Sequence, residues 1–182
     1  MSTVDCFVIR HAESLPDRNV PEDEWPLSVT GREQARALCA KMFDLGVKRI
    51  YSSPYSRAVA TVRPLAEALG IDLEIRDDLR ERRLAMGEID NWREELEKTW
   101  LDFDYSLPTG ESSRVCQQRM QACVLDILRT TDTSRIAICS HGNAIALLLN
   151  SLDPSFLFAQ WAAMGNPQLY HLVWDANILR IA

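Results

Sequence analysis

The chain has 182 residues, of which 47% are hydrophobic and 25% are charged, and its formal net charge is −6. This length favours a single domain with an ordinary hydrophobic core, and the negative charge argues against a nucleic-acid partner. The sequence contains neither an apolar run of membrane-spanning length nor a secretory signal, so no membrane partner is expected.

Five cysteines are spread along the chain, and none forms a Cys-x-x-Cys pair. The odd number and the lack of a signal favour reduced thiols in a cytoplasmic protein. Cys6 and Cys139 lie within apolar runs, so we expect buried core residues rather than reactive thiols. The three histidines lack metal-ligand spacing, so no metal or other cofactor is predicted. His171, in a strand-like alternation, is interpreted as structural.

The first 76 residues alternate between predicted strands and predicted helices. The expected elements are strands 4–9, 49–52 and 73–76 and helices 30–45 and 58–69. Thr30 and Glu33 have the spacing of a capping box that would begin the first helix, and Gly70 would end the second. This alternation predicts a parallel sheet with helices on both faces.

Residues 79–112 interrupt the alternation with one expected helix and loops, and their aromatic residues are expected to form a small core under a cap. The later expected elements are helices 116–128 and 144–149 and strands 135–139, 169–174 and 178–181. Strand 135–139 is strongly apolar and therefore expected at the centre of the sheet. The last two strands should form an antiparallel hairpin at an edge. The sequence thus predicts one domain, residues 1–182, built as a three-layer α/β/α sandwich. Its central sheet would be mostly parallel, with an antiparallel edge strand and a small cap-like insertion near 79–112.

Four polar stretches lie at predicted strand ends or in the loops that follow strands. They are Arg10-His11, residues 52–57 with Arg57, residues 79–81 with Glu81, and residues 140–143 with His141. Ligands of open α/β sheets bind at the carboxyl ends of the strands, where these stretches would meet. Arg10 and Arg57 have planar forks that match phosphate oxygens, and the helix beginning after His141 would also face an anion. The pattern therefore predicts a site for phosphate transfer.

His11 is the predicted nucleophile of this site. The surrounding cations should lower the pKa of its imidazole and keep it neutral, and a neutral imidazole nitrogen is a competent nucleophile. Glu81 would protonate the leaving alkoxide and then activate water to hydrolyse the phosphohistidine. The arginine and histidine side chains would supply positioning and charge stabilisation without a metal.

The sequence resembles the histidine phosphatase superfamily, in its phosphoglycerate-mutase-like branch. The matching segments, in the family's order, are Arg10-His11-Ala12-Glu13, Ser52-Ser53-Pro54 with Arg57, Leu79-Arg80-Glu81, Gly110-Glu111-Ser112, Ser140-His141-Gly142-Asn143 and Asn166-Pro167. An Arg-His pair alone is a weak motif, but four site motifs in order are specific. The fold that the resemblance implies agrees with the expected elements.

The resemblance implies roles for the matched residues. His11 would be phosphorylated and Glu81 would be the proton donor. The phosphoryl group would be clamped by Arg10, Arg57 and His141. The residues from which further substrate contacts are expected are Ser14, Asn19 and Gly142.

Two positions depart from the family pattern. Ala12 replaces the signature glycine, and a positive φ there would cost alanine roughly 1–2 kcal/mol, so an ordinary φ is predicted. Asp17 stands where the family often has an asparagine that helps to hold phosphate. A carboxylate would repel phosphate, so either Asn19 substitutes for the asparagine or one contact is missing.

Some of these residues also have simpler interpretations. Glu81 could pair with Arg82 or Arg83 at the surface, and Glu88 is a competing acid. Ser140 is interpreted as a support of its loop rather than a nucleophile, because the Gly-x-Ser-x-Gly elbow is absent.

Three functions are compatible with the sequence. The first is a metal-independent phosphatase that acts on a small phosphorylated metabolite. The second is a phosphoglycerate-type mutase, which must hold a second anionic group. Residues 90–111 contain only Arg93 and Lys98 against seven acids, which disfavours a mutase. The nearby arginines Arg82 and Arg83 could still bind a second anionic group, so a mutase remains an alternative. The third is a non-catalytic phosphate-binding or regulatory module, against which the intact set of site residues argues.

Overall fold

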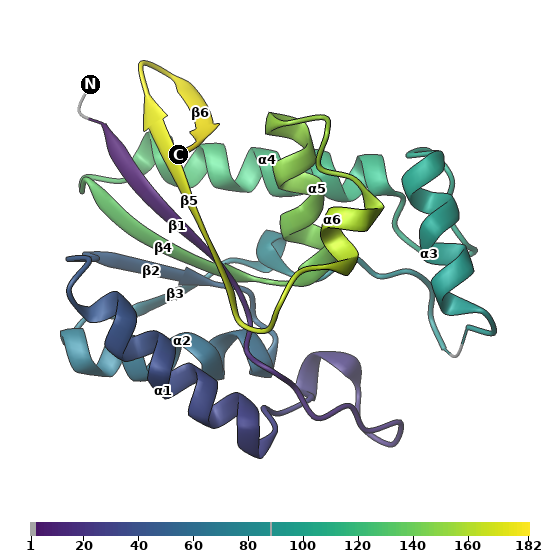
Figure 1. Ribbon diagram of the computed structural model, residues 1–182, viewed down its shortest axis with the longest axis horizontal. Helices are drawn as coiled ribbons and strands as arrows, with labels where there is room; N and C mark the ends of the chain where they lie inside the picture. Colours follow the sequence, from purple (N-terminus) through teal and green to yellow (C-terminus); the bar gives the residue numbers. More distant parts are fainter. Residues whose placement is uncertain (1–2, 88) are drawn as a thin grey trace.

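The computed structural model describes residues 3–87 and 89–182 and contains a six-stranded sheet with helices on both faces (Figure 1). The strands are β1 (Val4–Arg10), β2 (Arg49–Ser52), β3 (Leu73–Ile75), β4 (Arg135–Ser140), β5 (Gln168–Asp175) and β6 (Ile178–Ile181). The α-helices are α1 (Val29–Phe43), α2 (Ser56–Leu69), α3 (Trp92–Leu101), α4 (Ser113–Thr130), α5 (Gly142–Leu152) and α6 (Phe158–Ala162). Two short 3₁₀ helices, η1 (Glu22–Glu24) and η2 (Asp77–Leu79), lie in connecting segments.

The strand order β3-β2-β4-β1-β5-β6 confirms the mostly parallel sheet predicted from the sequence. β1, β2, β3 and β4 pair in parallel, because helical crossovers connect β1 to β2, β2 to β3 and β3 to β4. β5 pairs antiparallel with β1, and β6 pairs antiparallel with β5, so the closing hairpin forms one edge. β4 lies in the interior of the sheet, as its apolar sequence predicted.

Alternation of side chains along β1 divides the core into two layers. Cys6 and Val8 point into a core formed with α4 and α5, whereas Phe7 and Ile9 point into a core formed with α1 and α2. Figure 1 shows these two helix pairs on opposite sides of the sheet. Cys6 and Cys139 are both fully buried, and burial raises the pKa of the Cys6 thiol to about 12, so both predictions of core cysteines are confirmed.

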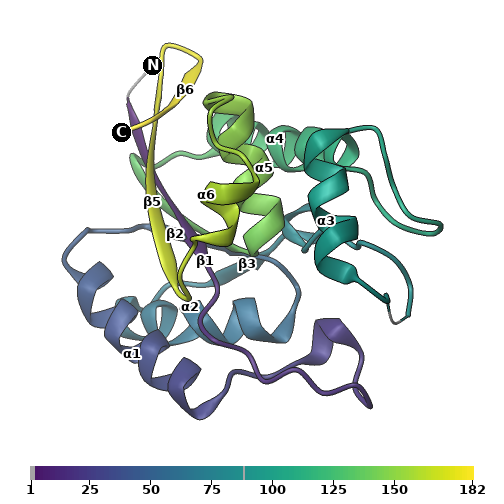
Figure 2. The same ribbon diagram turned by 45° about the vertical axis from the view of Figure 1, so that its right-hand side comes forward.

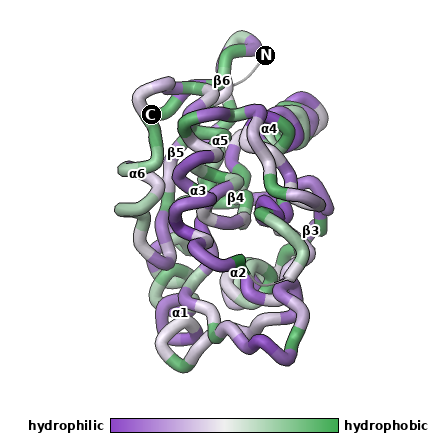
Figure 3. Tube along the Cα trace, turned by 90° about the vertical axis from the view of Figure 1, so that its right-hand side faces the viewer, coloured by the Kyte–Doolittle hydropathy of each residue, from purple (hydrophilic) through white to green (hydrophobic). Residues whose placement is uncertain are grey.

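The segment 79–112 carries α3, the one α-helix expected there. Trp100 is buried and, together with Leu96, joins the core that α4 and α5 form with the sheet. The expectation of a separate small core under a cap was therefore wrong, because these side chains extend the main core. Trp92, by contrast, is 54% exposed. α3 is largely hydrophilic along its trace, whereas α5 is largely hydrophobic (Figure 3).

Two connecting segments lie beyond the carboxyl ends of β1, β2 and β4. Figures 1 and 2 both show the loop of residues 15–27 and the α3 segment on that side of the sheet. The short helix α6, which the sequence analysis did not anticipate, lies near α5. Within the described residues, no helix is both long enough and apolar enough to cross a membrane.

The first residues of α1 differ from the prediction. The helix begins at Val29, and its N-cap is Ser28, whose hydroxyl accepts a hydrogen bond from the Gly31 N–H at 2.9 Å. The predicted capping box of Thr30 and Glu33 was wrong, because both residues lie inside the helix. α2 ends as predicted at Gly70, whose left-handed backbone (φ 64°) glycine adopts without strain.

Replacing Ser28 by alanine should remove this cap and lower the free energy of unfolding by about 1 kcal/mol, since an N–H donor would lose its partner. Thr30→Ala is the matched control, because Thr30 is exposed at the second position of the helix, and its effect should stay within about 0.5 kcal/mol. Urea denaturation of both variants measures the difference. Equal losses in the two variants would contradict the assignment of the cap.

Candidate active site

The register of three parallel strands brings the polar stretches together. Arg10 of β1 is aligned with Ser140 of β4, so the next residues, His11 and His141, are neighbours at the carboxyl edge. The His11 N–H donates to the Ser140 carbonyl at 3.0 Å, and the two imidazole rings meet edge to face with centroids 5.1 Å apart. β2 brings Ser53 to the same place, where its hydroxyl lies 2.7 Å from His141 Nε2.

Two contacts fix the protonation of His11, whose side chain is buried (7% exposed). Nδ1 lies 2.7 Å from the Ala12 carbonyl oxygen, which can only accept, so Nδ1 carries the hydrogen. Arg57 Nε, which can only donate, points to His11 Nε2 at 3.2 Å, so Nε2 presents its lone pair. The pKa of His11 is lowered to about 3, chiefly by burial; the Arg57 and Arg10 charges contribute to the lowering, and the contact with the Ala12 carbonyl opposes it. The direction agrees with the prediction, but burial rather than the nearby cations is the larger cause.

Arg57 is almost completely enclosed, with 4% of its side chain exposed. Its Nη2 forms an ion pair with Glu22 Oε1 at 2.8 Å, and its Nη1 donates to the Glu22 carbonyl at 2.5 Å. Its guanidinium also lies against the rings of Tyr55 and Trp25, 4.9 and 5.6 Å from their centroids. Sequence reasoning gave no role to Glu22, Tyr55 or Trp25. The only signal is position in the sequence: Glu22 and Trp25 follow the Arg10-His11 stretch, and Tyr55 lies within residues 52–57.

Arg10 is held against the start of α5. Its Nη1 donates to the Met164 carbonyl at 2.6 Å, and a Cβ on Gly142 would lie only 3.2 Å from the Arg10 guanidinium carbon. Glycine at position 142 therefore permits this close approach. Arg10 Nε is buried without a protein partner among the described residues. Burial lowers the pKa of Arg10, and the nearby carboxylate of Glu81 partly opposes this shift.

His141 is fully buried at the N-cap position of α5. Burial lowers its pKa well below the usual value, and the Arg57 charge adds to this effect. Its ring contacts Tyr55 edge to face at 4.8 Å. His141 Nδ1 has no hydrogen-bond partner in the described part of the chain.

The carboxylate of Glu81 lies at the N-terminus of the same helix, α5. Oε1 accepts from the Ala144 N–H at 3.0 Å and from the Arg82 N–H at 2.8 Å, and Oε2 accepts from the Asn143 N–H at 3.2 Å. A negative group is favourable there because it meets unpaired N–H groups. These partners differ from the proposed surface pairing with the side chain of Arg82 or Arg83. Glu88, the competing acid, lies outside the described residues.

The three residues from which further substrate contacts were expected differ in their position relative to the site. Gly142 begins α5 at the site, and Ser14 forms an isolated backbone bridge with Leu27 in the neighbouring loop. Asn19 is exposed, and its side-chain amide donates to the Asp17 carboxylate at 3.0 Å, so this contact turns it toward its own loop. The structure thus gives no support to Asn19 as the missing phosphate contact. Instead, the Asn166 side chain reaches the His11 carbonyl oxygen at 2.9 Å.

Three other predictions concern residues around the site. Ala12 does not have a positive φ, which agrees with the prediction, and its N–H donates to Thr61 Oγ1 at 2.9 Å. Ser140 Oγ donates to the Leu79 carbonyl at 2.7 Å and so supports the neighbouring loop, as expected. His171 contacts Asp5 and stacks on Phe7 within the sheet, which fits a structural role.

Two buried histidines, His11 and His141, and the guanidinium groups of Arg10 and Arg57 thus gather at the carboxyl edge of a mixed α/β sheet, the edge at which ligands of such sheets bind. Residues 6–181 match the family model of the histidine phosphatase superfamily (branch 1). The chain therefore belongs to the histidine phosphatase superfamily. It is 29% identical over 164 residues to a probable phosphoglycerate mutase GpmB of Enterobacter sp. (strain 638), with 82% of this chain and 74% of that protein covered.

Two solved structures share the fold. A mycobacterial glucosyl-3-phosphoglycerate phosphatase has a TM-score of 0.78 and 21% identity, with 100% of this chain and 97% of that chain covered. A mutant phosphoserine phosphatase from Entamoeba histolytica, in complex with phosphoserine, has a TM-score of 0.80 and 18% identity, with 98% and 95% covered. At these identities the likeness establishes the shared fold alone.

The lowered pKa of His11 makes stability depend on pH. Between about pH 6.5 and about pH 3 the unfolded imidazole binds a proton that the folded one does not, so stability falls as the pH falls through this window. His11→Gln should remove about 1 kcal/mol per pH unit from the slope of unfolding free energy between pH 6 and pH 4. Urea denaturation at several pH values measures the slope. A slope equal to that of the wild type would contradict the buried, neutral state of His11.

Proposed function

We propose that this protein is a metal-independent phosphatase that hydrolyses a small phosphomonoester through a phosphohistidine intermediate on His11. The observation that carries the proposal is the buried, unprotonated Nε2 of His11, which faces the Arg57 guanidinium. A nitrogen with an electron pair and no proton can attack phosphorus once Arg57 Nε, which now donates to it, turns to the phosphate, and the adjacent cation attracts the phosphate. All five cysteines are free thiols, which supports a cytoplasmic location.

In the first step, His11 Nε2 forms a bond to phosphorus while the bond between phosphorus and the leaving oxygen breaks. The negative phosphate bound beside Glu81 favours its protonated form, and protonated Glu81 gives its proton to that oxygen, so the alcohol leaves neutral. In the second step, water attacks phosphorus, the Glu81 carboxylate takes the proton of the water, and the P–N bond breaks. Inorganic phosphate leaves, and His11 and protonated Glu81 are restored.

The non-bridging phosphate oxygens would be held by Arg10, Arg57 and His141. Arg10 Nε and His141 Nδ1 are buried without protein partners among the described residues, so an anion there would complete their hydrogen bonding. The Glu22 carboxylate now occupies Nη2 of Arg57, and a bound phosphate would replace it. Binding would therefore require the Glu22 side chain to turn away from Arg57.

The space beside Glu81 suits a small ligand. A hollow of about 460 Å³ is lined by Tyr55, Glu81, Arg83 and residues 109–112, among others. This volume is within the range of small-molecule sites, which supports a metabolite as the substrate.

The alternative activity is that of a phosphoglycerate-type mutase, which the names of relatives such as the Enterobacter protein favour. A mutase needs cations for a second anionic group of the substrate. Arg82 is buried and donates to Ser113 and Thr99, so it does not line the hollow. The charged residues that line the hollow are the arginines Arg80 and Arg83 and the acids Glu81, Asp104 and Glu111, so the cations are outnumbered. This arrangement favours the phosphatase. Interconversion of 3-phosphoglycerate and 2-phosphoglycerate at a rate exceeding phosphate release would instead favour the mutase.

Replacing His11 by alanine should abolish phosphate release from 4-nitrophenyl phosphate measured with a chelator present, a loss of at least about 10³-fold, because no other group forms the phosphoenzyme. His171→Ala is the matched control, since His171 lies in the sheet away from the site, and it should retain activity. Brief exposure of the wild type to labelled ester should trap an acid-labile, base-stable phosphate that His11→Ala lacks. Equal turnover by wild type and His11→Ala would refute the proposal.

Glu81→Gln should reduce kcat/KM for an alkyl phosphate by about 10²-fold or more, because the poor leaving group needs a proton. The same variant should spare 4-nitrophenyl phosphate, whose leaving group departs without one. Benzyl phosphate is a matched alkyl ester of similar size. Equal losses on the two esters would remove the general-acid role from Glu81.

A further inference from the structure

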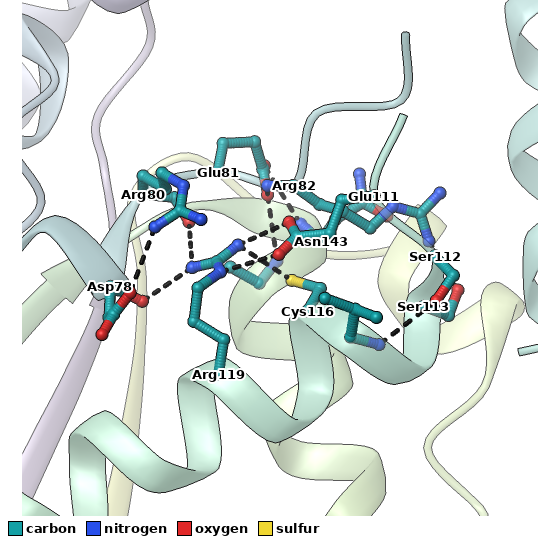
Figure 4. A network of polar contacts seen from close by, with 12 residues as sticks. Asp78, Arg80, Glu81, Arg82, Glu111, Ser112, Ser113, Cys116, Arg119 and Asn143 are labelled. Carbon is teal, nitrogen blue, oxygen red and sulfur yellow. Dashed lines mark hydrogen bonds and ion pairs between the residues drawn. The ribbon is translucent and has the colours of Figure 1, made fainter. Parts of the chain in front are cut away.

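The loop that carries Glu81 is held by its backbone carbonyl groups on both sides of that residue. Arg119 Nη1 donates to the Asp78 carbonyl at 2.7 Å and to the Arg80 carbonyl at 3.1 Å. Beyond Glu81, the Arg83 carbonyl accepts from the Glu111 N–H at 2.7 Å. Figure 4 shows Arg119 and Glu111 lying beneath this loop, between it and α4.

Arg119 and Glu111 form a bidentate ion pair. Arg119 Nε lies 2.8 Å from Glu111 Oε1 and Nη2 lies 2.7 Å from Oε2, and the two side chains are only 8% and 13% exposed. Charge-assisted bonds of this kind are directional, because the guanidinium is a rigid planar fork. All three nitrogens of Arg119 therefore have fixed partners, and the guanidinium links α4 to the loop that carries Glu81.

This link determines where the Glu81 carboxylate lies. The carboxylate accepts hydrogen bonds from the backbone N–H groups of Asn143 and Ala144, which belong to α5. A shift of the loop away from α5 would lengthen and weaken these contacts. Arg119 binds the carbonyls of Asp78 and Arg80, before Glu81, and the Glu111 backbone N–H binds that of Arg83, after it. The Glu111 side chain acts on the loop through Arg119, whose guanidinium it orients.

We propose that the Arg119–Glu111 pair is the positioning device for Glu81 and fixes its carboxylate for proton transfer to the leaving group. Arg119 is a positioning residue, since its three nitrogens all contact protein groups behind the loop. The inference rests on the proposed role of Glu81. The inference predicts a selective effect: loss of the pair slows the hydrolysis of esters whose leaving group needs a proton and spares that of esters whose leaving group does not.

The test compares Arg119→Gln and Glu111→Gln with Arg114→Gln. Arg114 is the matched control because it lies on the same helix and forms an exposed bidentate pair with Asp104. In the part of the chain that the structure describes, the side chains of this pair form no hydrogen bond or ion pair with residues 78–83. Arg119→Gln should lower kcat/KM for benzyl phosphate by about 10²-fold and that for 4-nitrophenyl phosphate by less than about threefold. The ratio kcat/KM is used because it reports the step in which the ester bond breaks.

A double-variant cycle separates positioning from a general loss of packing. On benzyl phosphate, the double variant Glu81→Gln with Arg119→Gln should be no slower than Glu81→Gln alone, because Arg119 acts through Glu81. Equal losses of Arg119→Gln on both esters, no loss on benzyl phosphate, or additive effects in the cycle would each overturn the inference.

Amide hydrogen exchange tests the positioning without any reaction. Exchange at Arg82 and Ala144, whose N–H groups donate to Glu81, should be at least about tenfold faster in Arg119→Gln and unchanged in Arg114→Gln. Unchanged exchange in Arg119→Gln would overturn the inference, whether or not the enzyme is active. Lack of activity of the wild type on every ester would by itself refute only the proposed function. If Arg119→Gln does not fold, Arg119→Lys, which keeps the charge but not the fork, should show the same changes at smaller size, and their absence would overturn the inference.

Discussion

The in-register parallel pairing of β1 with β4 is the constraint on which both the core and the site depend. It aligns Arg10 with Ser140, and so it places His11 against His141 at the end of the sheet. The same register directs alternate residues of β1 into the two helical layers. A slip of one residue would move every side chain of the strand to the opposite face of the sheet. The core would then lose its packing, and the two histidines of the site would no longer lie side by side.

Burial gives these histidines and arginines properties that they would lack in water. His11 and His141 have lowered pKa values chiefly because the enclosed environment disfavours a charged imidazole. The positive charge of the site is carried instead by Arg10 and Arg57, which stay protonated in proteins. Their guanidinium groups are stabilised by protein carbonyls and by Glu22, so the site holds cations beside neutral rings.

The 15–27 loop and the 79–112 segment surround a sheet edge that the fold itself fixes. The first contributes Glu22 and Trp25 to the surroundings of Arg57, and the second contributes Arg83 to the hollow beside Glu81. Related proteins with this fold carry names of both phosphatases and mutases. Because one fold can support different reactions, the charged residues on these two segments, rather than the fold, would determine which reaction is favoured.

The sequence by itself determined the elements and their class, because hydrophobic periodicity and strand–helix alternation are local properties that the fold preserves. It also identified the residues that the strand ends bring together, since motifs such as Ser140-His141-Gly142-Asn143 are contiguous in the chain. Only the tertiary structure decided which partners they have. The pairing of Glu22 with Arg57 and the contact of Asn166 with His11 join residues 35 and 155 positions apart, and the Arg119 contacts depend on how α4 packs beneath a distant loop. The N-cap of α1 was predicted wrongly for a related reason. Ser28 and Thr30 both have a hydroxyl that can cap a helix. Ser28 is the cap because the hydrogen bond from its N–H to the Glu13 carbonyl fixes the backbone at the residue before the helix.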